Sequence, residues 1–480
     1  MTALNAHLTR LESAGLISLA DAGPELEYLF RHALVQEAAY DSLLKSERRD
    51  LHRAAGEALE SLYPDRSGEL APRLAEHFWQ AGETEKALRY FLTAAENAAR
   101  GYANPEAISL YTRALRAAGA DLLSRAAILR ERGRLFETTG DFDRALADDE
   151  ASLEAARAAG DLDSEWQSLI RLGFLWSSRS YQETGEYYRQ ALDLARRLDD
   201  PRSLAHSLNW LGNFEINAEQ PIPSRGHHEE ALQIFTGLQD TAGIAETNDL
   251  LGISLTIGGD LVQAGLALGR ARDLYTQLGE RLGLSSVLVV RSLLGGETQT
   301  DIVVHPPVSL EESRQSAEQG LQLAADAGWR SGVVFALSCL GSCQVAAGDY
   351  GQALESTRQA LTLAREIQHR QWEIMASLAA GDAHTDILDL EEGEAHLRRG
   401  LSLGIESSSI HWIHSMTGHL ARNLLVRGKL EEAQTLIDQY VPADLPMQSL
   451  GQRLSWCARA LLALRQGDPS AALSILAKLE

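Results

Sequence analysis

Residues 340–360, LGSCQVAAGDYGQALESTRQA, contain the pattern that decides the fold. Small residues stand at Gly341, Ala353 and Ala360, 12 and 7 positions apart, and Gly348-Asp349 marks a turn between the first two. Small side chains on facing helices let the two helix axes approach closely. The pattern therefore predicts a hairpin of two antiparallel helices that meet at these three positions.

The same spacing recurs along most of the chain. The first small residue of each copy follows the previous one after 40, 39, 40, 40, 49, 40 and 40 residues, at Gly133, Gly173, Gly212, Gly252, Ser292, Gly341, Gly381 and Ala421. A single hairpin cannot bury its apolar face alone, so neighbouring hairpins must stack. The repeats predict an all-α, right-handed superhelical array of about ten helical hairpins.

This pattern of small residues resembles the tetratricopeptide repeat, although its period of about 40 exceeds the 34 residues of the standard repeat. The longer form resembles the arrays attached to bacterial signal-transduction ATPases of the STAND/AAA type, from about Ala71 to the C-terminus. We expect the array to occupy residues 66–440, with an inserted loop at 295–309 where the step of 49 falls. A break at 441–446 predicts a C-terminal hairpin or cap over residues 441–480.

The first 65 residues do not follow the repeat. Residues 2–14 are predicted to form a helix, residues 16–30 a β-hairpin with a turn at 21–24, and residues 32–44 and 47–62 two more helices. Helix, hairpin and helix together make the second half of a winged helix, followed here by a linker helix.

Residues 1 to about 118 also resemble a part of multidomain bacterial regulators, in which an ATPase precedes the winged helix and a tetratricopeptide array follows it. Many such regulators also carry cyclase, kinase or DNA-binding domains. The resemblance depends on four short matches: Phe30-Arg31-His32, Ala38-Ala39-Tyr40, Leu51-His52 and Ala103-Asn104-Pro105-Glu106-Ala107.

Motifs for nucleotide or metal chemistry are missing from the sequence. It contains no G-x-x-x-x-G-K-[ST] phosphate loop, no H-E-x-x-H and no C-x-x-C. Cys339 and Cys343 share a helix face and are interpreted as small core residues. His411, His414 and His419 lack the spacing of a metal site. We therefore predict that the chain is not an enzyme and uses no cofactor and no metal.

Two tryptophans, Trp372 and Trp412, are 40 residues apart and occupy the same repeat position, where other repeats carry Gly243, Gly283 or Gly332. They are interpreted as core filling between repeats. The alternative is an exposed aromatic lip for a partner.

Composition limits the classes of partner. The 480 residues include 44 Lys and Arg against 67 Asp and Glu, and this net charge of −23 repels nucleic-acid phosphates. Three cysteines cannot form a disulfide framework, and no apolar run approaches the ~18 residues of a membrane span. We predict a cytoplasmic protein that contacts neither nucleic acid nor membrane.

The predicted binding site follows from the repeat architecture. In tetratricopeptide arrays the first helix of each pair lines a concave groove. With the first small residue taken as position 8, positions 2, 5, 9 and 12 face this groove. In this chain they are Gln167, Ile170, Phe174 and Ser177; His206, Asn209, Asn213 and Ile216; Glu246, Asp249, Ile253 and Thr256; Phe335, Ser338, Ser342 and Val345; and Met375, Leu378, Asp382 and Thr385.

From this set we predict a partner-binding site at His206, Asn209, Asn213, Glu246, Asp249, Ser338 and Asp382. Asparagine side chains can hold the backbone of an extended peptide through amide hydrogen bonds. The acidic residues favour a partner that carries a basic residue. The remaining alternative is a solvated surface without a ligand.

The sequence thus favours a non-enzymatic interaction scaffold or ligand-sensing module of a cytoplasmic bacterial regulator. Its concave groove would bind a protein, a peptide or a small-molecule effector. One alternative is a regulatory fragment of an ATPase or nucleotide cyclase whose catalytic domains lie upstream or on another chain. The second alternative is DNA binding through the winged helix, which the net charge of −23 disfavours.

Overall fold

The computed structural model describes residues 2–21, 27–295 and 306–479. Most of the loop expected at 295–309 and of the turn expected at 21–24 lies outside these residues. The chain divides into two compact units, residues 1–119 and 120–480, which are described separately.

The first unit begins with the helix, β-hairpin and helices that the sequence predicts. Strands β1 and β2 pair antiparallel, with Ile17 opposite Phe30. The elements are α1 (Thr2–Ser13), β1 (Ile17–Asp21), β2 (Glu27–Phe30), α2 (Ala33–Asp41), α3 (Lys45–Leu62), the 3₁₀ turn η1 (Pro64–Arg66), α4 (Ala71–Ala81), α5 (Thr84–Arg100) and α6 (Asn104–Ala118).

The two compact units divide after Gly119, and the domain boundary predicted at residue 65 lies within the first of them. Helices α3 and α4, on either side of that position, pack together. A Cβ atom on Gly56 of α3 would lie 2.9 Å from the ring of Phe78 on α4, and Phe78 stacks on Tyr90 of α5 at 5.7 Å. Helix α3 therefore shares a core with the first repeat helices.

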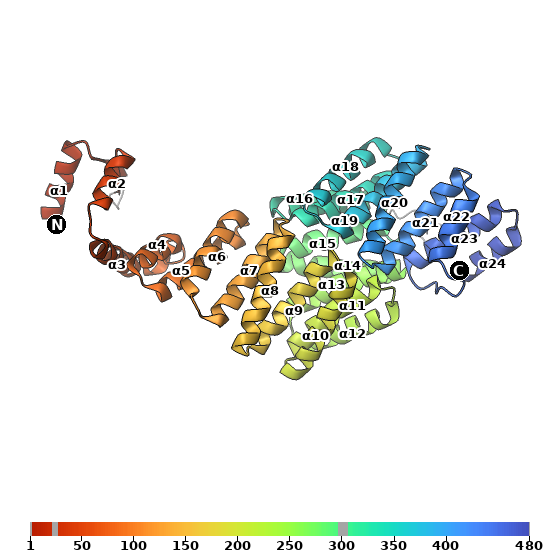
Figure 1. The fold of residues 1–480 in the computed structure, drawn as a ribbon, viewed down its shortest axis with the longest axis horizontal. Helices are drawn as coiled ribbons and strands as arrows, with labels where there is room; N and C mark the ends of the chain where they lie inside the picture. Colours follow the sequence, from red (N-terminus) through yellow and green to blue (C-terminus); the bar gives the residue numbers. More distant parts are fainter. Residues whose placement is uncertain (1, 22–26, 296–305, 480) are drawn as a thin grey trace. The chain divides into compact units, whose positions relative to one another are not determined.

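The second unit is a stack of helix pairs (Figure 1). Its helices are α7 (Leu122–Thr138), α8 (Phe142–Ala159), α9 (Leu162–Ser177), α10 (Tyr181–Leu198), α11 (Pro201–Asn217), α12 (Pro221–Gly237), α13 (Thr241–Gly258), α14 (Leu261–Leu278), α15 (Arg281–Ser292), α16 (Leu310–Asp326), α17 (Arg330–Ala346), α18 (Tyr350–Glu366), α19 (Arg370–Asp386), α20 (Leu390–Glu406), α21 (Ile410–Val426), α22 (Leu430–Tyr440), α23 (Leu450–Arg465) and α24 (Pro469–Leu479). The 3₁₀ turn η2 (Leu293–Gly295) follows α15. The predicted all-α solenoid of stacked helical hairpins is confirmed.

Close helix contacts occur at the small residues, as the spacing predicts. A Cβ atom on Gly341 of α17 would lie 2.7 Å from Cγ2 of Thr357 on α18. The corresponding Cβ on Gly252 would lie 2.5 Å from Leu268, and that on Gly173 would lie 2.4 Å from Tyr188. Such distances leave no room for a side chain, so each second helix lies directly on the backbone of its first helix.

Helix ends follow local sequence signals. Gly348, between α17 and α18, has φ of +79°, the left-handed conformation that glycine adopts without strain. Asp200 caps α11 by accepting hydrogen bonds from the backbone N–H groups of residues 202 and 203. Ser309 and Glu312 form a reciprocal capping box at the start of α16.

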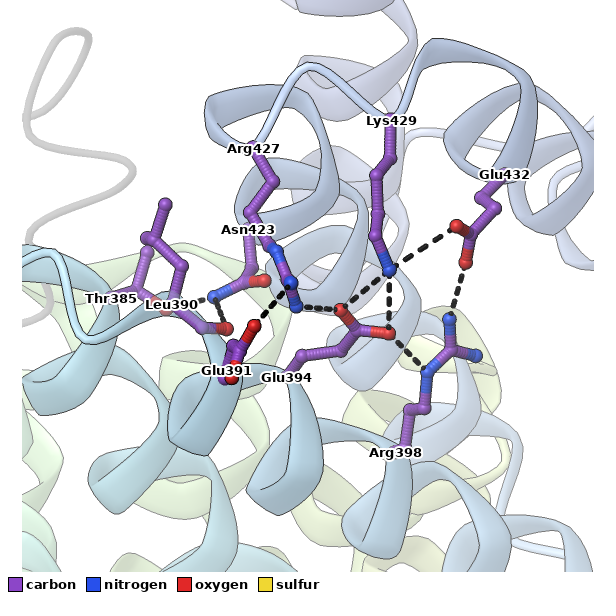
Figure 2. Close-up of polar contacts among 9 residues, drawn as sticks. All are labelled: Thr385, Leu390, Glu391, Glu394, Arg398, Asn423, Arg427, Lys429 and Glu432. Atoms are coloured by element: carbon purple, nitrogen blue, oxygen red, sulfur yellow. Dashed lines mark hydrogen bonds and ion pairs between the residues drawn. The ribbon is translucent and has the colours of Figure 1, made fainter.

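Three cationic side chains surround one glutamate near the C-terminal end of the array (Figure 2). Glu394 of α20 binds Arg398 at 2.7 Å, Lys429 at 3.1 Å and also Arg427. Beside this cluster, the buried Asn423 of α21 donates from Nδ2 to Thr385 of α19 at 2.8 Å. These contacts join α20 to the turn between α21 and α22, and α21 to α19. Beyond α22, residues 441–449 are not helical, and α23 packs mainly on α21.

None of the helices in the described parts of the chain has the length and hydropathy that crossing a membrane requires.

The close contact at Gly341 can be tested by Gly341→Leu. The new side chain would overlap Thr357, so we expect the free energy of unfolding to fall by roughly 1–3 kcal/mol or more through overpacking. Gly351→Leu is the matched control, because Gly351 is an exposed helical glycine with no atom within 4 Å of its Cβ position. Urea denaturation measures both, and equal midpoints would mean that the small-residue spacing does not mark close contacts.

Candidate partner-binding cavity

The first helices of the pairs in the second unit surround an interior cavity of about 940 Å³. Its walls come from α7, α9, α11, α13, α15, α17, α19, α21 and the start of α23, and they combine apolar, aromatic and charged side chains. The concave groove expected from the sequence is therefore a cavity that helices surround and that remains partly open to solvent.

Helices surround the cavity because the stack of helix pairs meets itself. The turns after α7, α9 and α11 contact the turns before α19 and α21 and the start of α23, and we call these contacts the seam. The backbone N–H of Tyr181 donates to the carbonyl of Ser407 at 2.9 Å, and that of Arg370 donates to Ser178 at 3.2 Å. Phe142 packs edge-to-face on His369 at 5.1 Å.

Glu219 forms the most polar contact of the seam. Its buried carboxylate lies in the turn between α11 and α12, 2.5 Å from Nδ1 of His414 on α21. The hydroxyl of Ser449 donates to the same carboxylate at 2.7 Å, and His411 lies 4.0 Å away. In sequence, His414 lies 195 residues after Glu219, and Ser449 lies 230 residues after it.

The register predicted for the groove holds best at position 9. All five residues at this position line the cavity: Phe174, Asn213, Ile253, Ser342 and Asp382. Five residues at the other three positions lie outside the lining: Gln167, Asn209, Ile216, Ser338 and Thr385. Position 9 points along the centre of the concave face, whereas positions 5 and 12 lie close to neighbouring helices.

Two predicted site residues, Asn209 and Ser338, do not face the cavity, which corrects their predicted orientation. Both are fully buried between helices. The Asn209 amide donates to Thr247 at 2.8 Å, and its oxygen lies 3.2 Å from Nδ1 of His228. The Ser338 hydroxyl donates to the carbonyl of Val334 within its own helix at 2.8 Å. The polar groups of both side chains already have hydrogen-bond partners in the core, so we leave the two residues out of the proposed site.

His206 and Glu246 face each other across the cavity wall formed by α11 and α13. His206 Nδ1 lies 2.8 Å from Glu246 Oε2, and the imidazole packs edge-to-face on Phe235 at 4.9 Å. Burial lowers the pKa of His206, but the hydrogen bond and charge of Glu246 outweigh burial and raise this pKa above its usual value.

Asp249 lies one turn further along α13 and has a different environment. Its side chain is buried, and Oδ1 has no hydrogen-bond partner among the described residues. Burial raises the pKa of Asp249 to about 7; a hydrogen bond from Ser286 opposes this shift, and the charge of Glu246 adds to it.

Asp382 and Asn213 complete the predicted set. Asp382 lines the cavity from α19 and is paired with Nδ1 of His419 at 2.7 Å. Asn213 is half-buried in the lining of α11, and its backbone carbonyl accepts a hydrogen bond from Asn217. Five of the seven predicted residues therefore share one cavity: His206, Asn213, Glu246, Asp249 and Asp382.

The sequence did not identify the charged end of the cavity. Arg171 of α9 pairs with Asp149 at 3.0 Å and approaches Glu137 at 3.9 Å. Glu137 and Arg171 line the cavity, whereas Asp149 lies behind them. Position 6 of a first helix, which Arg171 occupies, was outside the positions assigned to the groove.

Aromatic side chains form a second group in the cavity lining, which the sequence predicted only in part. Trp372 stacks on Phe335 at 4.5 Å, and both line the cavity, as does the buried Trp412. At Gly243 and Gly283 the space is filled by an aromatic ring from the preceding helix, Phe235 and Tyr275 respectively. Each ring stands eight positions before its glycine, which is a signal in the sequence. At Gly332 the ring of Trp329, three positions before, fills the space instead.

A G-x-S-x-G pattern, GLSLG at residues 400–404, does not form a nucleophile elbow. The elbow requires a sharp turn between a strand and a helix. Here the pattern lies inside α20, and the Ser402 hydroxyl donates to Glu406 one turn later at 3.0 Å. The serine therefore has neither the geometry nor the base of a hydrolase.

Comparison with known proteins yields similar folds at low sequence identity. No family model and no curated protein matches the chain. A Rap protein complexed with competence and sporulation factor is 13% identical with a TM-score of 0.49, covering 74% of this chain and 96% of that one. Yeast Tom70 is 13% identical with a TM-score of 0.38, covering 86% and 99%.

A signal transduction ATPase with numerous domains and a tetratricopeptide repeat sensor, from Pyrococcus horikoshii, is also similar. It is 12% identical with a TM-score of 0.33, and the match covers 98% of this chain and 57% of the ATPase. These likenesses concern the helical-repeat fold. They assign no function to the cavity.

Glu219→Gln tests the seam. It keeps the size of the side chain but removes the charge opposite His414, so we expect a loss of roughly 1–3 kcal/mol in unfolding free energy. The control is Glu229→Gln, which removes an exposed pair with Arg225 and should cost less than about 1 kcal/mol. Chemical denaturation compares the two variants, and a neutral Glu219→Gln would show that the seam does not depend on this charge.

Asp249→Asn tests the cost of the buried carboxyl group. The pKa of about 7 in the folded chain exceeds the value of about 3.9 expected for the unfolded chain. The folded state retains a proton between these two pH values, so stability falls as the pH rises through this window. The variant cannot ionise. We expect it to match the wild type near pH 4 and to exceed it by roughly 2–4 kcal/mol at pH 8.

Asp382→Asn is the matched control for this measurement. It removes the partner of His419, so it should lower the free energy of unfolding at pH 8 rather than raise it. Urea denaturation at both pH values separates the two cases. A loss of stability in Asp249→Asn at pH 8 would contradict the assignment of a buried, unpaired carboxyl group.

Proposed function

We propose that this chain is a non-catalytic binding scaffold that holds an extended peptide segment of a partner inside its interior cavity. The observation that carries the proposal is the cavity of about 940 Å³ that nine successive first helices surround. This volume is near the upper end of the range for ligand sites, about 300–1,000 Å³.

The lining has the character of a binding site. Apolar and aromatic residues such as Phe174, Ile253 and Phe335 supply surface that a ligand can bury. Between them, Asn213, His206 and Glu246 place polar groups at defined points of the wall. A few fixed polar groups in an apolar cavity are the usual means by which a protein orients a ligand.

The ligand that we propose is an extended peptide segment. The first helices from α7 to α23 surround the cavity, so a segment that runs through it meets lining residues on every side. Asn213 can both donate to and accept from a peptide backbone, which an extended segment presents along its whole length. The cellular setting that we propose, a cytoplasmic bacterial regulator, rests on the N-terminal sequence resemblance.

The test is selection of linear octapeptides from a random display library on the full chain, followed by fluorescence anisotropy with the selected peptides. We expect saturable binding. Asn213→Ala should weaken this binding by about 5- to 30-fold, which corresponds to roughly 1–2 kcal/mol for a buried amide contact.

Gln233→Ala is the control, because Gln233 is an exposed polar residue on α12, a second helix outside the cavity lining. It should leave the affinity unchanged. Failure to select any peptide would contradict the proposal. So would selected peptides whose affinity is the same in wild type and in Asn213→Ala, because they would bind elsewhere.

A further inference from the structure

One part of the cavity wall has more negative than positive charge. Asp240, Glu246, Asp249 and Glu280 lie at the cavity along α13 and the turn before α15. Two basic side chains are nearby, and each is already paired. Arg202 binds Asp240 at 3.1 Å, and His206 binds Glu246 at 2.8 Å. Among the described residues, Asp249 has no ion-pair partner.

Asp249 is also the most buried of these acids. Only 7% of its surface is exposed, and its Oδ1 atom is buried without a hydrogen-bond donor among the described residues. An unsatisfied buried oxygen opposes folding, and asparagine or an apolar residue would fill this place at lower cost. The arrangement is therefore explained better by a ligand than by stability.

We propose that Asp249 binds the ammonium or guanidinium group of a lysine or arginine side chain in the segment that occupies the cavity. The inference rests on the function proposed above and names the chemical group that the segment must carry. The charged group would donate hydrogen bonds to the free Oδ1 atom. Such charge-assisted bonds are about twice as strong as neutral ones.

The surroundings of Asp249 suit a long basic side chain. Leu250, Ile253 and Val290 line the cavity beside it, so the methylene stem can lie on apolar surface while its charged end reaches the carboxylate. A metal ion fits less well, because no group of three histidine, cysteine or acidic side chains in the described residues could hold one.

Binding of a cation should also release a proton. The groups that face Asp249 are Glu246 on α13, Tyr275 on α14 and Ser286 on α15, with His206 of α11 beyond Glu246. Without a ligand, burial favours the protonated carboxyl group. A ligand cation favours the ionised form, so the proton leaves to solvent when the segment binds below about pH 7.

The experiment compares peptide selection by the wild type with selection by Asp249→Asn, both as the full chain. We expect the wild type to enrich lysine or arginine at one position and the variant to lose this enrichment while still binding peptides. Affinities are then measured for pairs of synthetic peptides that differ only in carrying lysine or norleucine at this position. Norleucine should weaken binding to the wild type about 10- to 100-fold but leave binding to Asp249→Asn nearly unchanged.

Calorimetry at pH 6 in two buffers of different ionisation enthalpy should show proton release for the lysine peptide only. Asp193→Asn is the control variant, because Asp193 is exposed on α10 outside the cavity lining, and it should keep the preference for lysine. A lysine preference that survives in Asp249→Asn would overturn the inference.

Two further outcomes separate this inference from the proposed function. Peptide binding by the wild type without any basic preference would overturn the role of Asp249 and leave the scaffold proposal standing. No peptide binding by either protein would remove the scaffold proposal itself. If free N-acetyl-lysine amide bound as tightly as the peptide, the cation would belong to a small ligand, which overturns the assignment to a peptide side chain.

Discussion

The close approach of paired helices at glycine and alanine is the constraint on which the rest of this structure depends. At Gly173, Gly252 and Gly341 a side chain from the second helix lies where a Cβ atom would be. Each pair is therefore thin, and its two helices are fixed in register. Because every repeat applies the same geometry, the first helices all turn toward the same side of the stack, and their exposed faces become the wall of one cavity.

Closing this cavity requires contacts that no single repeat contains. The seam joins turns that are roughly 200 residues distant in the chain, and it uses backbone hydrogen bonds together with the buried carboxylate of Glu219. A buried carboxylate stabilises little by itself, because the cost of its desolvation offsets much of what its contacts contribute. Its value here is geometric. The pairing of Glu219 with His414 and Ser449 specifies which turns meet, and this sets the width of the cavity.

The interior of the cavity is not optimised for stability. Asp249 holds an ionisable group in a place that raises its pKa to about 7, and one of its oxygens has no partner in the described residues. Glu246 and Asp382, by contrast, are matched with histidines. Groups with perturbed pKa values and missing partners cluster at functional sites, where a ligand supplies what the fold omits. This contrast within one wall is the physical basis for assigning Asp249 a different role from its neighbours.

The sequence by itself determined the helical pairs, their period and much of the inward face, because these depend on contacts between residues less than one repeat apart. Gly341, Ala353 and Ala360 were enough to define a hairpin, and position 9 identified lining residues such as Asn213 and Asp382. Only the tertiary structure showed that Asn209 and Ser338 are buried in the core and that Glu219 forms a hydrogen bond with His414. The cavity, too, is a feature that only the tertiary structure decided. Small rotations between neighbouring repeats add up over five or six hairpins before the stack meets itself, and a local pattern of residues does not fix that sum.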